Sequence, residues 1–371
     1  MAYRLLHFSD LHLDASFAAD GVSSAVGDWR RSDLRAALAR ILALARDQRV
    51  DAVTIAGDLY DERTAMPDTG DFLAQQFARL GNIPVVIAPG HSDPYTARSL
   101  YALTRWPSNV HIFANELTAV RLAPDIDLWG ASQEGAMAMA PALGAFQSGI
   151  HLLLRHGSDK RSKGFEQDLG AVRRQGFTLV LSGGSHAAGE WPEDAPLWVW
   201  GGSPEPLAWE DGEGDRGLVT VTIEDSRTSW QRLRVAQWRY WRTDVDVSDC
   251  ADGDEAVRKI KNVLTVAPGG ADERLMCRMT LVGTPPVALD LSTLHPRLET
   301  PAHVSIVSRL SSSLNLDRLS EEQTVRGLLA RRFQDRLANI QDPQQRQLTL
   351  KALGLALDAL AGRQVRDHET A

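Results

Sequence analysis

Five short apolar segments in the first half of the chain each end in a polar cluster, and this pattern is the strongest constraint on the fold. The segments are Arg4–Phe8, Ala52–Ala56, Pro84–Ala88, Ile150–Leu154 and Phe177–Leu181. Their length and composition are typical of buried strands, and helical patterns lie between the first three. Buried strands joined by helical crossovers predict a mostly parallel sheet with both faces covered, in an α/β fold.

The helical patterns are predicted from apolar spacing. Leu34, Leu38, Ile41 and Leu42 fall on one face of a helix for which Asp33 is the expected N-cap. A second helix is predicted over Phe72–Leu80. Because the strands on either side of these helices would run parallel, their carboxyl ends should meet at one edge, where such sheets bind ligands.

Carboxylates and imidazoles follow the predicted strands at that edge. The candidate ligands are Asp10, His12, Asp58, His91, His156 and His186. This mixture of ligands suits a borderline divalent metal such as Mn, Fe or Zn. Two ions about 3.5–4 Å apart, bridged by a carboxylate, would clamp the attacking and leaving oxygens of a phosphodiester during hydrolysis.

A second unit is predicted from about residue 237, where a strand, a helix around Glu255–Val266 and a strand over Leu275–Val282 follow one another. From Ser320 onward, two apolar stripes separated by Pro343 predict a pair of helices. The predicted divisions are residues 1–236, 237–319 and 320–371.

Net charge limits how the chain can bind nucleic acid. It is −8 at pH 7, whereas a protein that holds duplex DNA over a broad face by charge alone is usually basic. A DNA-binding role would therefore need a metal centre, a partner or a local basic patch. Lys160, Arg161 and Lys163, just after His156, form one such candidate for DNA phosphates, or else a solvated loop and helix face.

Two further features bear on cellular location. Cys250 and Cys277 have no metal-binding spacing and are expected to be reduced, buried thiols. The first residues reach Asp10 after only a few apolar positions, and no run approaches about 20 apolar residues. A cytoplasmic protein without a membrane segment is expected.

Three motifs carry a resemblance to a known family. His7–Asp14 reads HFSDLHLD, Ala56–Asp61 reads AGDLYD, and Gly201–Leu207 reads GGSPEPL. Over residues 3–236 the chain resembles the calcineurin-like metallophosphoesterase superfamily, and within it the SbcD/YhaO branch of bacterial DNA repair exonucleases. Generic phosphoesterases lack the third motif.

The resemblance implies an architecture and a set of partners. Members have a layered β-sandwich flanked by helices, a smaller α+β capping domain that leads DNA to the metals, and C-terminal helices. Those helices dock on the coiled-coil root of an SMC-like ATPase, although here they could instead pack on the cap. Manganese is the implied ion, and a homodimer is possible within this resemblance.

The resemblance also assigns the ligands. The first metal would be held by Asp10, His12, Asp58 and His186, with Asp58 bridging. The second would take Asp58, His156, the residue at the Asn of the family motif GNHD, and the first His of the motif GHxH.

Two motifs depart from the family pattern. GNHD reads Gly90-His91-Ser92-Asp93 here, so His91 stands at the Asn ligand position and Ser92 replaces the catalytic His. GHxH reads Gly183-Gly184-Ser185-His186, so Gly184 replaces a ligand to the second metal. A serine hydroxyl is a poor general acid, whereas an imidazole in this role is typically worth about 10²–10⁴-fold. His91 could keep the ligand role or take over the acid role.

Three functions are compatible with these residues. The first is a metal-dependent DNA exonuclease or endonuclease of the SbcD type in DNA repair, with weakened or altered catalysis and one well-held ion. The second is a non-catalytic DNA-end-binding or scaffold subunit of an SMC-like ATPase complex. The third is a phosphoesterase for small phosphodiesters, against which the GSPEPL motif and the predicted cap argue.

Overall fold

The computed structural model describes residues 2–17, 23–114, 116–132, 146, 148–157, 172–191, 197–211, 216–225, 227–286, 289–310 and 316–360. Two compact units divide the chain. The first comprises Met1–Trp241 with Glu273–Met276, and the second comprises Arg242–Asp272 with Cys277–Ala371. Within the described ranges, no helix is both long enough and apolar enough to cross a membrane.

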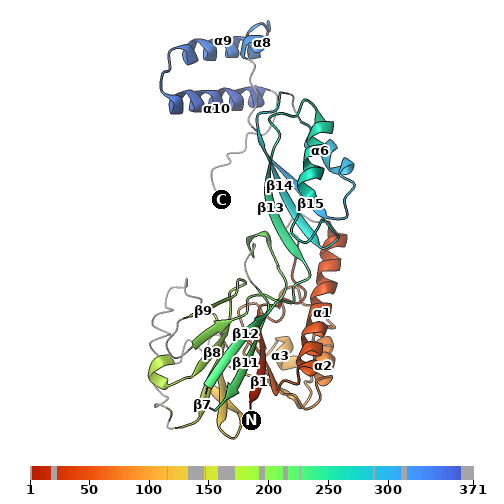
Figure 1. Cartoon of the computed structure of the whole chain (residues 1–371), viewed down its shortest axis with the longest axis vertical. Coiled ribbons are helices and arrows are strands. Elements are labelled where there is room, and N and C mark those ends of the chain that lie inside the picture. The colour runs from red at the N-terminus through yellow and green to blue at the C-terminus, as the bar shows by residue number, and fades with distance from the viewer. Residues whose placement is uncertain are drawn as a thin grey trace. The chain divides into compact units, whose positions relative to one another are not determined.

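The first unit contains two six-stranded sheets, with α1, α2 and α3 among its described helices (Figure 1). One sheet has the strand order β12-β11-β1-β2-β3-β4 and the other β5-β6-β7-β8-β10-β9. In chain order the elements are β1 (Tyr3–Phe8), α1 (Ser24–Asp47), β2 (Ala52–Ile55), α2 (Thr69–Ala78), β3 (Val85–Ile87), α3 (Leu100–Leu103), β4 (Val110–Ile112), β5 (Thr118–Ala123), β6 (Ile126–Gly130), β7 (Ile150–His156), β8 (Leu179–Gly183), β9 (Gly189–Trp191), β10 (Leu197–Trp200), the 3₁₀ helix η2 (Trp209–Asp211), β11 (Leu218–Glu224) and β12 (Arg227–Leu233).

Strand pairing corrects the prediction of a single, mostly parallel sheet. Strands β1 to β4 pair in parallel, and β6, β7, β8 and β10 form a second parallel set in the other sheet. Antiparallel strands β11, β12, β5 and β9 complete the two sheets. Apolar run length predicts burial on both faces but does not say which sheet a strand joins.

Three apolar layers hold the unit together. Between the sheets, side chains such as Leu5 and Val86 pack against Leu152 and Leu181. Helices α1 and α2 cover the outer face of the first sheet through residues that include Leu38, Ile41, Leu73 and Phe77. Trp198 and Trp200 pack with Phe177 on the outer face of the second sheet. The predicted layered β-sandwich flanked by helices is confirmed.

Helix α1 begins earlier than its apolar pattern indicates. Its N-cap is Ser23, whose side chain accepts a hydrogen bond from the Val26 amide, so the predicted N-cap at Asp33 is wrong. Asp33 lies in the helix interior, where its carboxylate accepts a hydrogen bond from Trp238 Nε1 at 2.7 Å. The first helical turns lack a clear apolar stripe, which is why the sequence pattern misses them.

The second unit combines most of a three-stranded sheet with helices, since the first residues of β13 and β14 belong to the first unit. The sheet order is β13-β14-β15, and the buried residues of α6 are Ala256, Val257, Ile260 and Leu264. The elements are β13 (Arg239–Asp246), α6 (Gly253–Leu264), β14 (Leu275–Gly283), α7 (Leu291–Leu294), η3 (His295–Arg297), β15 (His303–Leu310), α8 (Leu316–Ser320), α9 (Val325–Ala338) and α10 (Pro343–Leu360). Pro343 is the first residue of α10, a position that tolerates its missing amide proton.

Candidate metal centre

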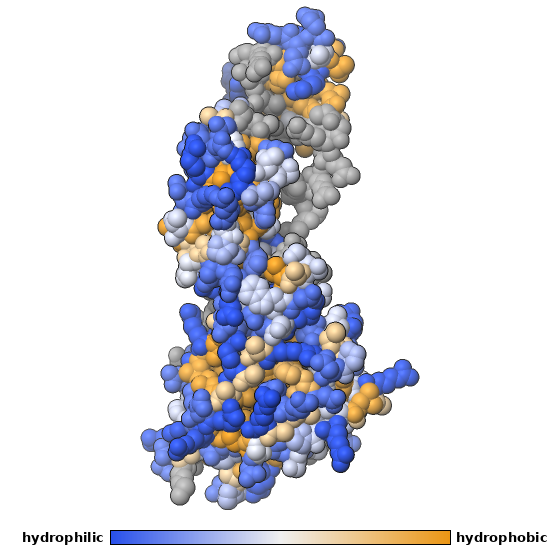
Figure 2. Space-filling model, turned by 90° about the vertical axis from the view of Figure 1, so that its right-hand side faces the viewer, coloured by the Kyte–Doolittle hydropathy of each residue, from blue (hydrophilic) through white to orange (hydrophobic). Residues whose placement is uncertain are grey.

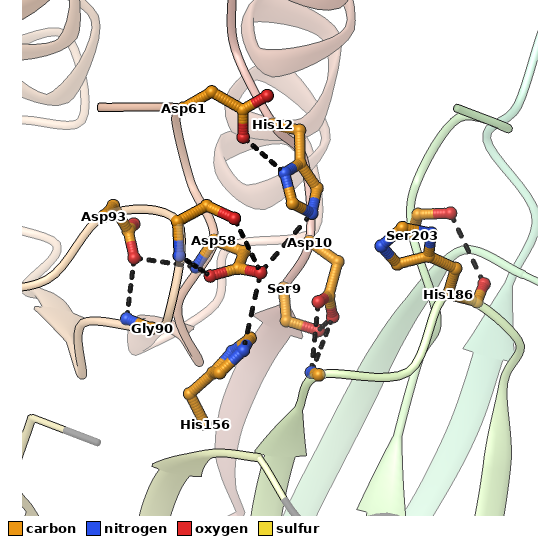
Figure 3. A network of polar contacts seen from close by, with 12 residues as sticks. Ser9, Asp10, His12, Asp58, Asp61, Gly90, Asp93, His156, His186 and Ser203 are labelled. Carbon is orange, nitrogen blue, oxygen red and sulfur yellow. Dashed lines mark hydrogen bonds and ion pairs between the residues drawn. The ribbon is translucent and has the colours of Figure 1, made fainter. Parts of the chain in front are cut away.

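Five of the six predicted ligands lie together at the ends of strands from both sheets (Figure 3). Asp10 and His12 follow β1, Asp58 follows β2, His156 is the last residue of β7, and His186 follows β8. They form two overlapping groups, Asp10 with His12 and His186, and Asp10 with Asp58 and His156. In each group the candidate ligand atoms lie within 4.8 Å of one another.

Asp58 stands between two of the imidazoles. His12 Nε2 and His156 Nε2 are each 3.5 Å from Asp58 Oδ2. Burial raises the pKa of Asp58, but the neighbouring imidazoles of His156 and His12 outweigh this effect and lower it below its ordinary value. An ionised carboxylate facing two imidazole nitrogens is the arrangement expected of a ligand shared between cations.

Asp10 belongs to both groups and is fully buried. Its carboxylate accepts hydrogen bonds from Ser9 Oγ at 2.5 Å and from the Gly184 amide, which lies 3.0 Å from both oxygens. Burial raises the pKa of Asp10. A buried carboxylate of this kind is costly unless a cation compensates its charge.

Three imidazoles are held through Nδ1, which leaves Nε2 available for a metal. His12 Nδ1 is 2.6 Å from Asp61 Oδ1, and His186 Nδ1 is 2.7 Å from Asp211 Oδ1. His156 Nδ1 donates to the Ala56 carbonyl oxygen at 2.8 Å. Metal-binding histidines commonly donate their other ring nitrogen to a carboxylate or a carbonyl in this way.

Buried His12 Nε2 has no hydrogen-bond partner among the described residues. A buried nitrogen that faces Asp58 without a hydrogen bond to it fits a divalent cation better than it fits a purely structural role. The ligand set therefore fits the metal that a phosphoesterase of this kind would need.

The carboxylates behind His12 and His186 also change their basicity. Burial lowers the pKa of His12, but the hydrogen bond and charge of Asp61, together with Asp58, raise it to about 9. Burial also lowers the pKa of His186, and Asp211 raises it above the ordinary value. A more basic imidazole is a stronger ligand, although it must lose its proton before it can bind a cation.

Backbone strain is concentrated in the same place. Asp10, His12 and Asp58 have φ of 55°, 49° and 51°, in the left-handed region that side chains other than glycine rarely adopt. Main-chain hydrogen bonds from the Asp10 amide to Gly57 and from the His12 amide to Asp58 hold the two segments side by side. Strain of this kind persists where the surrounding structure fixes it, and it gathers at functional sites.

Two glycines allow the ligand segments to approach one another. A Cβ at Gly90 would lie 2.3 Å from Asp58 Oδ1, and one at Gly57 would lie 2.6 Å from His156 Nδ1. Any side chain at either position would displace a candidate ligand.

The two altered positions of the motif Gly90-His91-Ser92-Asp93 behave differently. The Ser92 amide donates to Asp58 Oδ1 at 2.8 Å, and its hydroxyl donates to Asp58 Oδ2 at 3.3 Å. His91 is exposed and belongs to neither ligand group, although its ring lies edge-on to His156 with centroids 5.4 Å apart. Ser92 therefore contacts the candidate ligand Asp58, whereas exposed His91 lies beside His156.

Gly184 leaves no room for the family's missing imidazole without a backbone shift. Its φ is 91°, and a Cβ there would lie 3.0 Å from Gly157 Cα and N and 3.4 Å from His156 Nε2. Sequence comparison with the family predicts a vacant ligand position, whereas the backbone itself closes part of this space.

Three carboxylates of the site were not assigned from the sequence. Asp61 and Asp211 hold His12 and His186, as described above. Asp93 is fully buried and accepts hydrogen bonds from the amides of Asp58 and Gly90 through Oδ1, at 3.0 and 2.6 Å. Asp61 lies in the quoted AGDLYD motif and Asp93 in the altered GNHD motif, but Asp211 has no motif of its own.

The GGSPEPL segment contacts both the candidate ligand His186 and the chain at residues 237–238. The Ser203 amide donates to the His186 carbonyl at 3.0 Å, and Glu205, which is buried, accepts hydrogen bonds from the amides of Gln237 and Trp238. Arg40 of α1 also pairs with Glu205, at 2.9 Å. This segment therefore positions a candidate ligand and anchors the chain where it leaves the sandwich.

The predicted basic cluster of Lys160, Arg161 and Lys163 lies outside the described residues, and it stays a prediction.

The fold and this site define a metal-dependent phosphoesterase. Residues 3–188 match the family model of the calcineurin-like phosphoesterases, and the chain belongs to this family. Family members use divalent metals to hydrolyse phosphoesters, and the two ligand groups are the place where this chain would bind them.

Among curated proteins, the chain is similar to the uncharacterized metallophosphoesterase YhaO of Bacillus subtilis strain 168. The two are 24% identical over 263 residues, which is 65% of this chain and 62% of that relative. The match therefore spans less than two thirds of the relative's length.

Two solved structures of low sequence identity are also similar. A Thermus thermophilus protein is 13% identical, with a TM-score of 0.34, and the match covers 62% of this chain and 99% of that one. A predicted phosphoesterase from Streptococcus pneumoniae TIGR4 is 15% identical, with a TM-score of 0.32, over 62% of this chain and 90% of that one.

Proposed function

We propose that the chain is a manganese-dependent phosphodiesterase that cleaves DNA, as an exonuclease or endonuclease of the SbcD type in DNA repair, with weakened or altered catalysis. The observation that carries the proposal is the convergence of two carboxylates and three imidazoles. The Nδ1 atom of each imidazole is hydrogen-bonded to the protein, so that Nε2 can bind a metal. Mixed nitrogen and oxygen ligands suit Mn²⁺.

The bound ions would polarise the phosphoryl oxygen and activate water at neutral pH. The chain's own contribution is to fix the ligands before substrate arrives. Asp10 and Asp58 supply negative charge in a buried site, and Asp61 and Asp211 hold the imidazoles of His12 and His186 through Nδ1. Such preorganisation avoids reorganisation during the reaction.

Weakened catalysis follows from the two altered motifs. Ser92 is already hydrogen-bonded to Asp58 and has no group that titrates near neutral pH. Gly184 supplies no side chain to a second ion. The second ion of a two-metal mechanism is therefore expected to bind weakly or not at all.

DNA as the substrate is supported by sequence rather than by a bound ligand. The GSPEPL segment resembles a signature of the SbcD/YhaO branch and here holds His186 and residues 237–238. A unit of α+β type follows, with the order expected of a DNA-guiding cap.

An SMC-like ATPase remains the proposed partner, because apolar residues are exposed on the last helix. Leu348 and Leu355 of α10, which are seven residues apart and therefore share a helix face, are 68% and 40% exposed. Apolar colour on the C-terminal helices is visible among polar residues at the top of Figure 2. An apolar helix face of this kind suits a partner helix. The possible homodimer stays a prediction.

A second candidate function is a non-catalytic DNA-end-binding or scaffold subunit. The specific observation in its favour is that Ser92, at the position of the family's proton donor, is used to hold Asp58. Such a protein would bind DNA or ATPase without turnover above background and would hold one metal per chain.

The test compares wild type with Asp58→Ala on duplex DNA ends and on a model phosphodiester, each with and without Mn²⁺. The proposal expects Mn²⁺-stimulated DNA cleavage that falls about 10³-fold in the variant, since lost charge stabilisation is worth several kcal/mol. Asp71→Asn, an exposed position on α2, is the matched control.

Three outcomes are informative. Cleavage of DNA that survives Asp58→Ala would contradict the proposed site. Hydrolysis of the model diester without DNA cleavage would favour a small-molecule phosphodiesterase. Binding of DNA ends without cleavage of either substrate would favour the scaffold.

A further inference from the structure

We infer that Arg35, which is outside the ligand set, is a positioning residue for His12 and acts through the loop that carries Asp61. The inference rests on the proposed metal-binding role of His12. The 61–69 loop, residues 61–69, runs from the segment after β2 to the start of α2. Its first residue, Asp61, holds His12 Nδ1 at 2.6 Å.

The start of the 61–69 loop is tied to the ligand segments. The Asp61 amide donates to the Leu13 carbonyl at 3.0 Å, and the Glu62 amide donates to the Ser92 carbonyl at 2.8 Å. These two bonds place the backbone of Asp61 between His12 and the altered motif. They do not fix the direction of its side chain, which also depends on how the rest of the loop is held.

Asp14 holds the far end of the loop. It lies two residues beyond His12, is 2% exposed and has a φ of 64°. Its Oδ2 accepts hydrogen bonds from the Met66 amide at 3.0 Å and from the Thr69 hydroxyl. The segment that carries His12 is therefore fastened to both ends of the loop that carries Asp61.

Arg35 of α1 completes this anchor. It donates to Asp68 at 2.6 and 3.1 Å, to the Thr69 hydroxyl at 2.9 Å and to Asp14 Oδ1 at 3.4 Å. Its guanidinium also lies over the Phe72 ring, 4.9 Å from the centroid. One planar cation thus joins α1, the loop, α2 and the buried carboxylate of Asp14.

The chemistry of this anchor selects arginine. Asp68 is 64% exposed, so its pairing with Arg35 contributes little by itself. Asp14 is almost fully buried, and a buried carboxylate needs a compensating cation. Lysine has one point of charge and cannot make the forked contacts that a guanidinium makes. Loss of Arg35 should release the loop and turn Asp61 away from His12.

The test uses the full chain and two readouts. In the metal-free protein, NMR measures how fast the His12 Nδ1–H proton, which is hydrogen-bonded to Asp61, exchanges with water. In Arg35→Gln this exchange should be about tenfold faster. With Mn²⁺, calorimetry should show about fivefold weaker binding, below the 10–100-fold effect of direct outer-shell partners because Arg35 acts one contact further away. Arg31→Gln, on the same helix and in an exposed pair with Asp28, is the matched control.

A double-mutant cycle separates a positioning role from a general effect on folding. If Arg35 acts through Asp61, Arg35→Gln should weaken Mn²⁺ binding no further in an Asp61→Asn background. Asp68→Asn keeps Arg35 over Asp14, provides a milder variant if Arg35→Gln does not fold, and should weaken binding about twofold.

The inference is overturned if ring N–H exchange in Arg35→Gln, or in Asp68→Asn when only that variant folds, matches the wild type. It is also overturned if the Arg35 and Asp61 effects on Mn²⁺ binding multiply. A wild type that binds no Mn²⁺ would contradict the proposed function instead, and the exchange rates would still decide the role of Arg35.

Discussion

The two candidate ligand groups differ in how their imidazoles are held. One group contains His12 and His186, and the other contains His156. On one side, His12 and His186 are each held by a carboxylate, Asp61 or Asp211. On the other side, His156 is held by the neutral carbonyl of Ala56. A carboxylate makes an imidazole a stronger ligand than a carbonyl does. The first side is therefore expected to bind its ion more tightly.

The altered motifs fall on the weaker side. Ser92 contacts Asp58, exposed His91 lies beside His156, and Gly184 offers only its amide, which binds Asp10. A chain can thus keep the fold and one complete ligand group while the second group changes. One tightly held ion and a weak second one are the expected state.

The largest expected effect comes from Asp10, which both sides share. Asp10→Asn should weaken Mn²⁺ binding by more than about 100-fold, because even outer partners of a metal ligand are worth 10–100-fold. Calorimetry measures it. Retention of one tight ion in this variant would break the comparison, since Asp10 could then belong to one side at most.

Restoring the family residues on the weaker side should have unequal results. Ser92→His should raise kcat of phosphodiester cleavage by about 10–100-fold, below or near the lower end of what general acids provide, because the second ion remains weak. Gly184→His should give no gain and lower stability, since its φ is 91° and its Cβ would crowd Gly157. Steady-state kinetics and thermal melting are the measurements.

A larger gain from Gly184→His than from Ser92→His would contradict this account. It would mean that the backbone at residue 184 yields readily and that the missing ligand, not the missing acid, limits the rate. Ser92→Ala is the control for loss of the hydroxyl contact with Asp58.

Removing a supporting carboxylate should have a moderate effect on the stronger side. Asp211→Asn should weaken Mn²⁺ binding about tenfold, because the side-chain amide oxygen can still accept a hydrogen bond from His186 but carries no charge. Metal titration of the two proteins checks this. Equal affinities would show that Asp211 serves only to hold the preceding loop, where its Oδ2 accepts hydrogen bonds from the Leu207 and Ala208 amides at 2.6 and 3.0 Å.

The smallest effect on the metal site is expected at His7, which lies below it between the sheets. His7 Nε2 donates to the Ser182 carbonyl and Nδ1 accepts from Thr54, both at 3.1 Å. Burial lowers the pKa of His7 to about 4 from its ordinary value of 6.5. The unfolded chain therefore binds this proton more readily than the folded protein does.

The sign of the pH effect follows. Between about pH 6.5 and pH 4 the free energy of unfolding should fall as pH falls, by on the order of 3 kcal/mol from this group, with no further loss below. Urea unfolding at pH 7 and pH 4.5 measures it. His7→Gln should flatten this slope with Mn²⁺ affinity at pH 7 unchanged. An identical slope in the variant would assign the effect to other groups.

Much of the fold, and the meeting of most candidate ligands at one place, could be predicted from the sequence. Strand ends place Asp10, Asp58 and His156 correctly because apolar run length locates buried strands well. The division into two sheets could not be predicted, because a strand buried on both faces looks the same in either sheet. The start of α1 was missed because its first turns carry no apolar stripe.

The supporting contacts were beyond sequence reasoning for a different reason. Asp211 holds His186 from 25 residues away, and Arg35 contacts Asp14 and Asp68 across two elements. Such contacts depend on the tertiary fold and leave no local spacing signal. The hydrogen bond from Ser92 to Asp58 likewise shows only in coordinates, whereas the sequence shows only a lost histidine.

The most direct test of the unequal metal centre is a count of bound Mn²⁺ with the affinity of each ion. Equilibrium titration of purified chain, with total metal determined after desalting, gives both numbers. The account predicts one ion retained per chain and a second that binds at least about tenfold more weakly. Two ions of equal affinity, or none, would contradict it.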